Sequence, residues 1–268
     1  MTIIAAEETL VTLAENGVLQ ITLNRPEHGN SIRAETVPEF VRMFQAVAGD
    51  PAVRCVLLQG AGKHFNTGGD LQAYSQELVG GPENLQRSFQ RRLENAGDLV
   101  TALLSIDRPV IARCRGVVAG AGLMFALSAD WVIADETAEF MFSHRRVGLS
   151  PDGGVSFLLP RVVGARKAAQ LILGAARVRA DDALSLGLVT QLVGCNQLDD
   201  AVSALACELA GAPQLAMRTA KRLIYSADTQ DLKTHLAAER QGIVKCVSHP
   251  DFAEGVRGFM ERRKPRFL

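Results

Sequence analysis

Apolar positions at the start of the chain predict a β-hairpin, a helix and a buried strand. Residues 10–13 and 18–23 are rich in β-branched and apolar side chains, and the Asn-Gly step between them favours a hairpin turn. Over residues 34–47, apolar side chains recur at helical spacing. Residues 53–59 form a continuous apolar run, which is typical of a strand buried on both faces. This order of strand, helix and strand predicts an α/β fold.

Three glycine-bearing junctions then lead into helices, at residues 60–71, 115–130 and 148–154. Glycine lets a backbone come close to a ligand, and the first turn of a helix offers unpaired N–H donors at the positive end of the helix dipole. The junction at residues 115–130 is therefore a candidate site for holding an anion. The alternative is a junction that needs glycine only for packing.

The remaining pattern changes from mixed to almost purely helical. A long amphipathic helix is expected over residues 85–103. Extended segments are expected over residues 110–114, 131–134, 138–142 and 188–193. Helices are expected over residues 165–173, 180–186, 198–210, 214–225, 232–247 and 251–263. We expect a core over residues 1–196 and a C-terminal helical region over residues 197–268 that packs on the core or on a neighbouring subunit.

Composition limits the classes of function. Lys plus Arg and Asp plus Glu both total 29, so no net field favours nucleic acid or an anionic membrane as a partner. The longest apolar run, residues 117–129, is too short to span a bilayer. The first ten residues, which include Glu7 and Glu8, do not have the pattern of a secretory signal.

The cysteines and histidines indicate no metal and no disulfide framework. The five cysteines are widely spaced without a C-x-x-C pair, and the five histidines show no spacing typical of metal ligands. We therefore expect a cytoplasmic protein in a reducing compartment, with no metal site and no nucleic-acid or membrane partner.

The three junctions, GKHFNTGGDL, RPVIARCRGVVAGAGLMFALSAD and GLSPDGG, resemble those of the crotonase (enoyl-CoA hydratase/isomerase) superfamily. The resemblance also covers LNRPEHGNSI, RADDALSLGLV and FMERRKPRF, and so spans essentially the whole chain. It implies a crotonase-like (ClpP/crotonase) spiral of ββα repeats with a C-terminal helical trimerisation region. It also implies a homotrimer or a dimer of trimers, a coenzyme A thioester as substrate and no permanently bound cofactor.

The resemblance implies an oxyanion hole formed by two backbone N–H groups, those of Gly69 and Ala121. Removing a proton from carbon 2 of a thioester places negative charge on the thioester oxygen. Two preorganised donors stabilise that enolate, and removing one such donor costs about 3–4 kcal/mol in other enzymes.

The acidic residues implied by the resemblance favour an isomerase. Hydratases of the family use two glutamates, whose positions correspond here to Met124 and His144. Asp152 lies where enoyl-CoA isomerases and epoxyphenylacetyl-CoA isomerases of the family carry a single acidic base, which moves a proton from carbon 2 to carbon 4. The alternative for Asp152 is a helix N-cap, and for His144 a hydrogen-bonded structural residue. Related hydrolases also need a histidine in the helix over residues 99–106, which has none.

The remaining candidates follow from the same resemblance. The predicted acyl pocket contains Met124, His144, Leu149 and Phe157. The predicted coenzyme A contacts are Arg25, Lys63, His64, Phe65, Gly68, Asp70, Leu71 and Lys264. Two other functions stay open: an enoyl-CoA hydratase with atypical residues, and a non-catalytic acyl-CoA-binding scaffold.

Overall fold

The computed structural model describes residue 6 and residues 8–268 of the chain. The prediction about a secretory signal lies mostly outside this part. Strands in this part are β1 (Thr9–Leu13), β2 (Val18–Leu23), β3 (Cys55–Gly60), β4 (Val110–Cys114), β5 (Val117–Ala119), β6 (Trp131–Asp135), β7 (Glu139–Met141), β8 (Arg177–Arg179) and β9 (Gln191–Val193). Helices are α1 (Val37–Gly49), α2 (Leu71–Glu77), α3 (Pro82–Leu104), α4 (Ala121–Ser128), α5 (Val155–Val163), α6 (Ala165–Leu173), α7 (Ala180–Ser185), α8 (Leu198–Ala210), α9 (Gln214–Ser226), α10 (Leu232–Val247) and α11 (Pro250–Met260).

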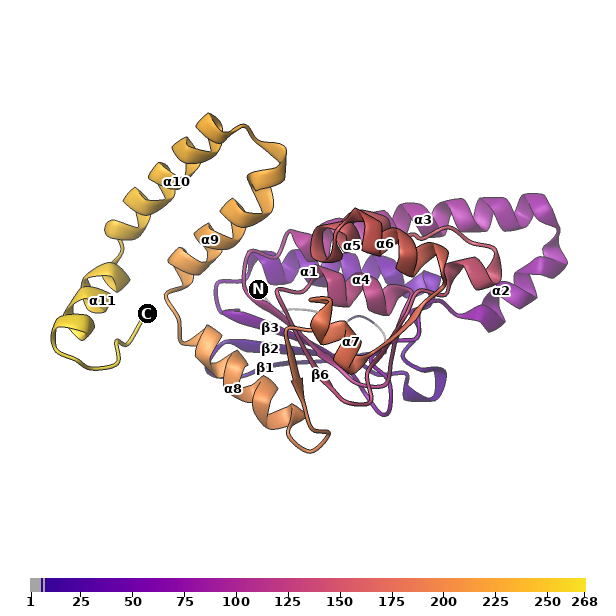
Figure 1. The fold of residues 1–268 in the computed structure, drawn as a ribbon, viewed down its shortest axis with the longest axis horizontal. Helices are drawn as coiled ribbons and strands as arrows, with labels where there is room; N and C mark the ends of the chain where they lie inside the picture. Colours follow the sequence, from indigo (N-terminus) through magenta and orange to yellow (C-terminus); the bar gives the residue numbers. More distant parts are fainter. Residues whose placement is uncertain (1–5, 7) are drawn as a thin grey trace.

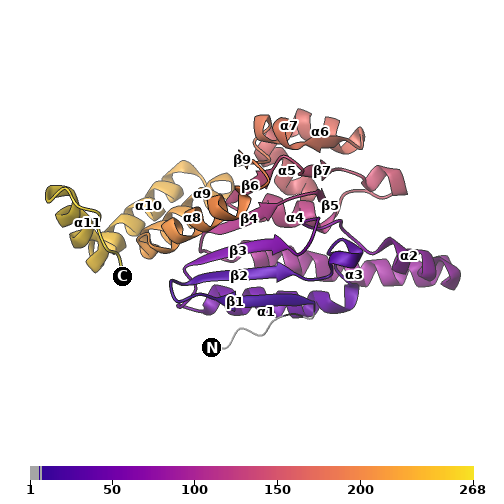
Figure 2. The same cartoon turned by 90° about the horizontal axis from the view of Figure 1, so that it is seen from below.

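A six-stranded sheet forms the centre of the molecule, in the order β1-β2-β3-β4-β6-β9 (Figure 2). The predicted hairpin is confirmed, because β1 and β2 pair antiparallel, and Gly17 supplies the positive φ of +85° that its turn requires. The other neighbouring strands pair parallel. A smaller sheet has the order β5-β7-β8.

The chain alternates between the two sheets, which confirms the expected ββα spiral. Strand β4 of the large sheet is followed by β5 of the small sheet and by α4, and β6 is followed by β7 and then by α5. Asn66 forms an isolated parallel bridge with Val118, so the loop after β3 continues the small sheet before α2 begins. Each repeat therefore delivers one loop-to-helix junction beside the next.

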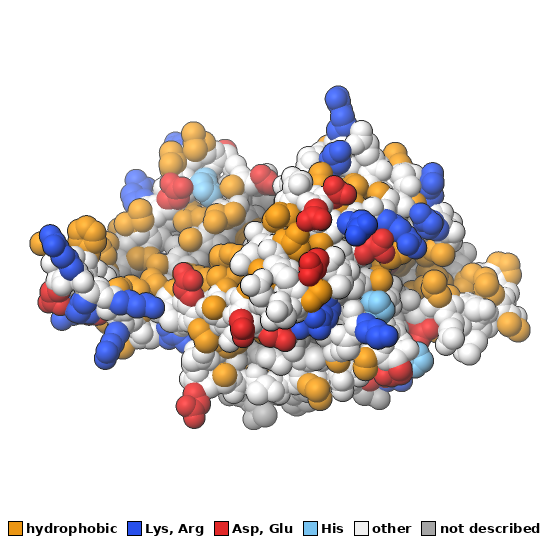
Figure 3. Space-filling model, turned by 60° about the horizontal axis from the view of Figure 1, so that its bottom comes forward, with side chains coloured by type: hydrophobic (Ala, Val, Ile, Leu, Met, Phe, Trp, Pro, Cys, Tyr) orange, Lys and Arg blue, Asp and Glu red, His pale blue; other side chains and the backbone are white. Residues whose placement is uncertain are grey.

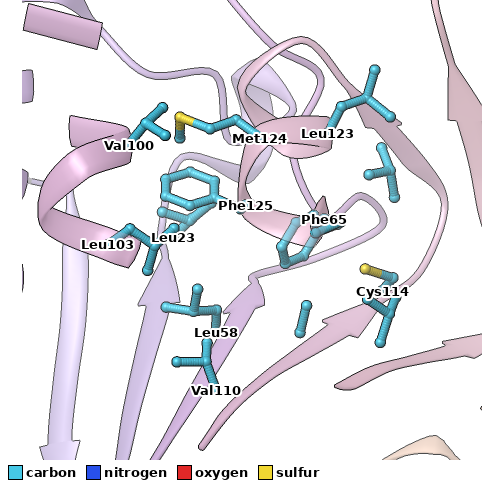
Figure 4. Packing of buried hydrophobic residues seen from close by; sticks show 14 of the residues in the cluster. Leu23, Leu58, Phe65, Val100, Leu103, Val110, Cys114, Leu123, Met124 and Phe125 are labelled. Atoms are coloured by element: carbon cyan, nitrogen blue, oxygen red, sulfur yellow. The ribbon is translucent and has the colours of Figure 1, made fainter. Parts of the chain in front are cut away.

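Helices cover both faces of the large sheet, as the continuous apolar strands predicted (Figure 1). Val56 and Leu58 of β3 belong to the larger core, which also contains buried residues of α1, α3 and α4. Figure 4 shows Leu58 in this core together with Phe125 of α4. The alternate residues Cys55 and Leu57 pack on the opposite face against α8.

The last three helices, α9, α10 and α11, form an arm that projects from the body (Figure 1). Helix α9 is attached by ion pairs, with Lys221 Nζ 2.7 Å from Asp130 Oδ2 and Arg218 Nη2 2.9 Å from Asp107 Oδ2. Helix α8, in contrast, packs on the sheet.

The boundary expected between a core over residues 1–196 and a C-terminal region over residues 197–268 stays a prediction. No helix in the described residues is both long and apolar enough to cross a membrane.

Two local features differ from the expectations. Strand β8 was not predicted, because a three-residue strand is too short to show a period of two. Helix α5 begins at Val155, later than an N-cap at Asp152 would require, because Gly153 and Gly154 both have positive φ angles of +56° and +74°.

Candidate active site

The three glycine-bearing junctions meet at a cavity of about 610 Å³. Gly68 and Gly69 line it from the first junction, Ala121 from the second and Asp152 from the third. Helices α2 and α3 supply the facing wall. The spiral of repeats thus brings together residues 69, 121 and 152, which lie far apart in the sequence.

Bare backbone makes the contact between the first two junctions. A Cβ atom on Gly120 would lie 2.8 Å from the Gly68 Cα and 3.6 Å from the Gly69 nitrogen. Gly120 also has φ +50° and ψ −115°, a conformation that side-chain-bearing residues rarely adopt. Glycine is therefore required at residue 120 both for the close contact with Gly68 and for the backbone conformation. Because residue 120 has no side chain, residues 69 and 121 can approach each other.

Asn66 ties the same two junctions together. Its side chain is fully buried, its Oδ1 accepts a hydrogen bond from the Gly68 N–H at 2.8 Å, and its Nδ2 donates to the Asn30 carbonyl at 2.6 Å. Its backbone carbonyl accepts from the Ala119 N–H at 2.9 Å. One residue thus fixes the loop before Gly69 and the strand before Ala121.

The N–H groups of Gly69 and Ala121 have no hydrogen-bond partner among residue 6 and residues 8–268. Ala121 is the first residue of α4, so its N–H lies at the positive end of the helix dipole. Two unpaired donors on adjoining junctions at one cavity have the chemistry that an oxyanion requires. Their role as an oxyanion hole stays a prediction.

Asp152 lines the cavity and does not cap α5. The N-cap of α5 is Gly154, and no side chain caps this helix. Asp152 accepts the Val155 N–H through its backbone carbonyl and not through its carboxylate. The capping alternative is therefore wrong. The Asp152 side chain is half exposed, and its Oδ1 lies 3.5 Å from the Nε2 of His144.

Met124 and His144, which the sequence resemblance places at the positions of the hydratase glutamates, both line the cavity. Met124 is 2% exposed and lies one turn beyond Ala121 on α4. A Cβ on Gly153 would lie 3.5 Å from the Met124 Cβ, so the loop that carries Asp152 packs on the helix that begins at Ala121. Leu149 also lies in the cavity wall, and its role in an acyl pocket stays a prediction.

Tyr74 and Arg92 line the cavity but were not predicted. The Tyr74 hydroxyl occupies the space that a Cβ on Gly69 would need. Burial raises the pKa of Tyr74, and the nearby Asp152 charge adds to the rise, which keeps the phenol protonated. The Arg92 guanidinium lies 4.8 Å from the Tyr74 ring centroid and pairs with Glu77. The spacing of apolar residues predicts helices but does not show which polar side chains on them face a cavity, so Tyr74 and Arg92 could not be predicted in this way.

The predicted coenzyme A contacts divide into three groups. Gly68, Asp70 and Leu71 line the cavity. The Asp70 carboxylate caps α2 by accepting from the Ala73 and Gln72 N–H groups, and these bonds, the first above all, lower its pKa. Lys63 is exposed and lies outside the cavity wall, as does Lys264 in the C-terminal tail, and for both the coenzyme A role stays a prediction.

Three other predicted contacts are engaged elsewhere in the protein. The Phe65 side chain is 1% exposed and packs in the larger core. Arg25 is buried and pairs with Glu8 and Asp70. The His64 Nδ1 accepts a hydrogen bond from the Val117 N–H at 3.1 Å. The structure places none of the three in the cavity wall.

Phe157 also lies outside the cavity, which corrects its assignment to the acyl pocket. Its side chain is 56% exposed, and the Arg161 guanidinium lies 3.6 Å from its ring centroid. Helix α5 is oriented so that Leu158 and Leu159 face the interior, and the Phe157 ring on the same turn therefore faces outward.

Comparisons with known proteins agree with this architecture. The family model described as Enoyl-CoA hydratase/isomerase matches residues 13–268. The chain belongs to the enoyl-CoA hydratase/isomerase family. Its relatives include the 1,2-epoxyphenylacetyl-CoA isomerase of Escherichia coli, 36% identical over 260 residues, which cover 97% of this chain and 98% of the relative. A protein of Rhodobacter capsulatus named "Probable enoyl-CoA hydratase" is 34% identical over 251 residues, 94% of each chain.

Solved structures of enoyl-CoA hydratase/isomerase family members confirm the crotonase fold. The crystal structure of an enoyl-CoA hydratase from Polaromonas sp. JS666 has a TM-score of 0.88 and 30% identity, and the match covers 97% of this chain and 99% of that one. Because relatives are named both as isomerases and as hydratases, family membership establishes acyl-CoA processing of the enoyl-CoA hydratase/isomerase type. The choice of reaction depends on the residues of the cavity.

Proposed function

We propose that this enoyl-CoA hydratase/isomerase family member is an enoyl-CoA isomerase with Asp152 as its base. The observation that carries the proposal is that Asp152 lines the same cavity as the unpaired N–H groups of Gly69 and Ala121, whereas Met124 and His144 replace both hydratase glutamates. One carboxylate is sufficient for moving a proton between two carbons. A hydratase must in addition position a water molecule.

The proposed reaction has two proton transfers. Asp152 takes a proton from carbon 2, and the electron pair of the broken C–H bond moves onto the thioester oxygen, where the N–H groups of Gly69 and Ala121 stabilise the charge. When the carbonyl reforms, the double bond lies between carbons 2 and 3, and the carboxylic acid returns its proton to carbon 4. The reaction consumes no water and needs no cofactor.

Two other carboxylates line the cavity, and they are less suited to this role. Asp70 is committed to capping α2 and to its pair with Arg25. Glu35 belongs to the short turn Ala34–Thr36 before α1. Asp152 instead directly precedes Gly153, which packs on Met124 near the start of α4.

The test is an assay of purified protein with 3-enoyl-CoA, 2-enoyl-CoA and 1,2-epoxyphenylacetyl-CoA, the last because of the name of the Escherichia coli relative. We expect isomerisation, and we expect Asp152→Asn to lower kcat by about 10²–10⁴-fold, the usual contribution of a general base. Asp181→Asn, at an exposed position on α7, is the matched control. Rapid hydration of 2-enoyl-CoA would favour the hydratase alternative, and binding without turnover of any thioester would favour the scaffold.

We also propose that the arm packs against further copies of the chain, as a homotrimer or a dimer of trimers. Several large apolar side chains on α9–α11 are strongly exposed: Ile224 at 70%, Leu232 at 72%, Ile243 at 66%, Phe259 at 83% and Met260 at 74%. Figure 3 shows hydrophobic side chains gathered along the arm. An unpartnered apolar surface of this kind marks an interface.

Light scattering coupled to size exclusion tests the assembly. We expect a mass of three or six chains for the wild type and a smaller mass for Phe259→Asp, with Asp181→Asn as the unchanged control. A monomeric wild-type protein over the micromolar range would contradict this proposal while leaving the proposed reaction open to its own assay.

A further inference from the structure

We propose that His144 is a positioning residue that orients the Asp152 carboxylate through its Nε2–H group. This inference rests on the proposed function, because it concerns how the base of that reaction is held. It assigns a role to a residue that stands where a hydratase carries one of its glutamates.

The loop between the two residues holds them face to face. His144 begins a short 3-10 helix, His144–Val147, and its backbone carbonyl accepts the Leu149 N–H at 3.0 Å. Gly148 supplies the positive φ of +73° that reverses the chain. The loop then returns Asp152 to within 3.5 Å of the imidazole, measured from His144 Nε2 to Asp152 Oδ1.

The two side chains differ in their freedom to move. The His144 side chain is 11% exposed, so its ring is held by packing, whereas the Asp152 side chain is 51% exposed. A half-exposed carboxylate on a loop can rotate away from a substrate. Contact with a fixed ring at Oδ1 restrains this rotation and leaves Oδ2 available for the proton from carbon 2.

The surroundings of the ring determine which nitrogen carries the proton. The His144 Nδ1 is buried and has no hydrogen-bond partner among the described residues. A proton on Nδ1 of the neutral ring would be a buried donor without an acceptor. The tautomer with its proton on Nε2 avoids this and directs its N–H group at the Asp152 carboxylate.

The separation of 3.5 Å is longer than an ordinary hydrogen bond, as is common for catalytic pairs without substrate. A bound acyl group would exclude water from the cavity and favour closure of the gap. We therefore expect the contribution of His144 to appear in the proton-transfer step, and to be small in substrate binding.

Deuterium exchange at carbon 2 of phenylacetyl-CoA and butyryl-CoA measures this step alone, since neither probe has a double bond to move. The decisive variants are His144→Gln, whose amide nitrogen can occupy the place of Nε2, and His144→Asn, whose shorter amide reaches only the place of Nδ1. The two carry the same polar group, so their difference reports on position. His144→Leu removes the donor, and His28→Leu, at an exposed position, is the control.

We expect His144→Asn and His144→Leu to lower the exchange kcat by about 10–100-fold with little change in KM, the range found when a hydrogen-bond partner that orients a metal ligand is removed. We expect His144→Gln to stay near the wild-type rate, and circular dichroism to show that each variant folds. If His144→Leu does not fold, the difference in exchange rate between His144→Gln and His144→Asn still tests the proposal.

Two results would overturn the inference while leaving Asp152 as the base: equal exchange by all His144 variants and the wild type, or equal loss in the Gln and Asn variants. In both cases Asp152→Asn abolishes exchange. If instead Asp152→Asn exchanges normally, or the wild type exchanges neither probe, the proposed function itself fails.

Discussion

Replacing Gly120 by alanine tests whether the contact between the first two junctions forms the anion site. The added Cβ would lie 2.8 Å from the Gly68 Cα, whereas ordinary van der Waals contacts begin at 3.4 Å. The two backbones must therefore separate by about 0.6 Å, because the interior is too densely packed to absorb the overlap. That separation would move the Gly69 and Ala121 N–H groups apart.

The magnitude follows from two effects. A misplacement of about 1 Å can cost about 10²-fold in rate, and loss of one oxyanion donor costs about 10²–10³-fold in kcat. We therefore expect the Gly120→Ala kcat to be about 100-fold lower. The backbone strain at φ +50° adds a loss of about 1–3 kcal/mol in the free energy of unfolding, which lowers the Tm by about 2–4 °C per kcal/mol.

The measurements are steady-state kinetics with the thioester panel and thermal unfolding followed by circular dichroism. Gly97→Ala on α3 is the matched control, since a Cβ there meets nothing within 4 Å and alanine favours a helix. If Gly120→Ala folds and keeps the wild-type kcat, the argument that this contact positions the donors is refuted.

The other predictions concern three single residues. Asn66→Ala leaves the Gly68 N–H and the Asn30 carbonyl unpaired in a buried site, so urea unfolding should show a loss of about 1–3 kcal/mol, and an unchanged midpoint would contradict this. Phe157→Ala should keep kcat and KM near their wild-type values, because the ring lies outside the cavity; a large rise in KM would restore the original pocket prediction. The hydrogen bond from Arg263 lowers the pKa of Glu254 to about 2 from 4.5, so its stabilisation is present above pH 4.5 and is lost as the pH falls to about 2. The Tm difference between wild type and Glu254→Gln should therefore shrink over that window, and a constant difference would argue against the pairing.

The sequence predicted features that depend on local chemistry. The Asn-Gly step identified the hairpin, and the continuous apolar run at residues 53–59 identified a strand covered on both faces. The positions of Gly69, Ala121 and Asp152 came from the resemblance, and the structure brings all three to one cavity. Each of these depends on a few neighbouring residues or on a motif with fixed spacing.

Features set by long-range packing were harder to predict. Phe157 and Leu158 are neighbours on an apolar helix, and only the packing of α5 on the body determines which one is exposed. Tyr74 and Arg92 enter the site because α2 and α3 fold over the first junction. The capping alternative for Asp152 failed because Gly154, two residues later, takes the left-handed conformation that starts the helix.

The paired N–H groups at Gly69 and Ala121 belong to the main chain, and this has a consequence for how the protein can change. A point mutation cannot delete a main-chain donor unless it introduces proline, so away from the tightly packed glycines at residues 68, 69 and 120 a substitution leaves both donors in place. The cavity residues at positions 124, 144 and 152, in contrast, contribute ordinary side chains, and of these only His144 and Asp152 carry a group that can exchange a proton. Substitution at those three positions could therefore change the reaction that the cavity supports while the two main-chain donors stay where they are.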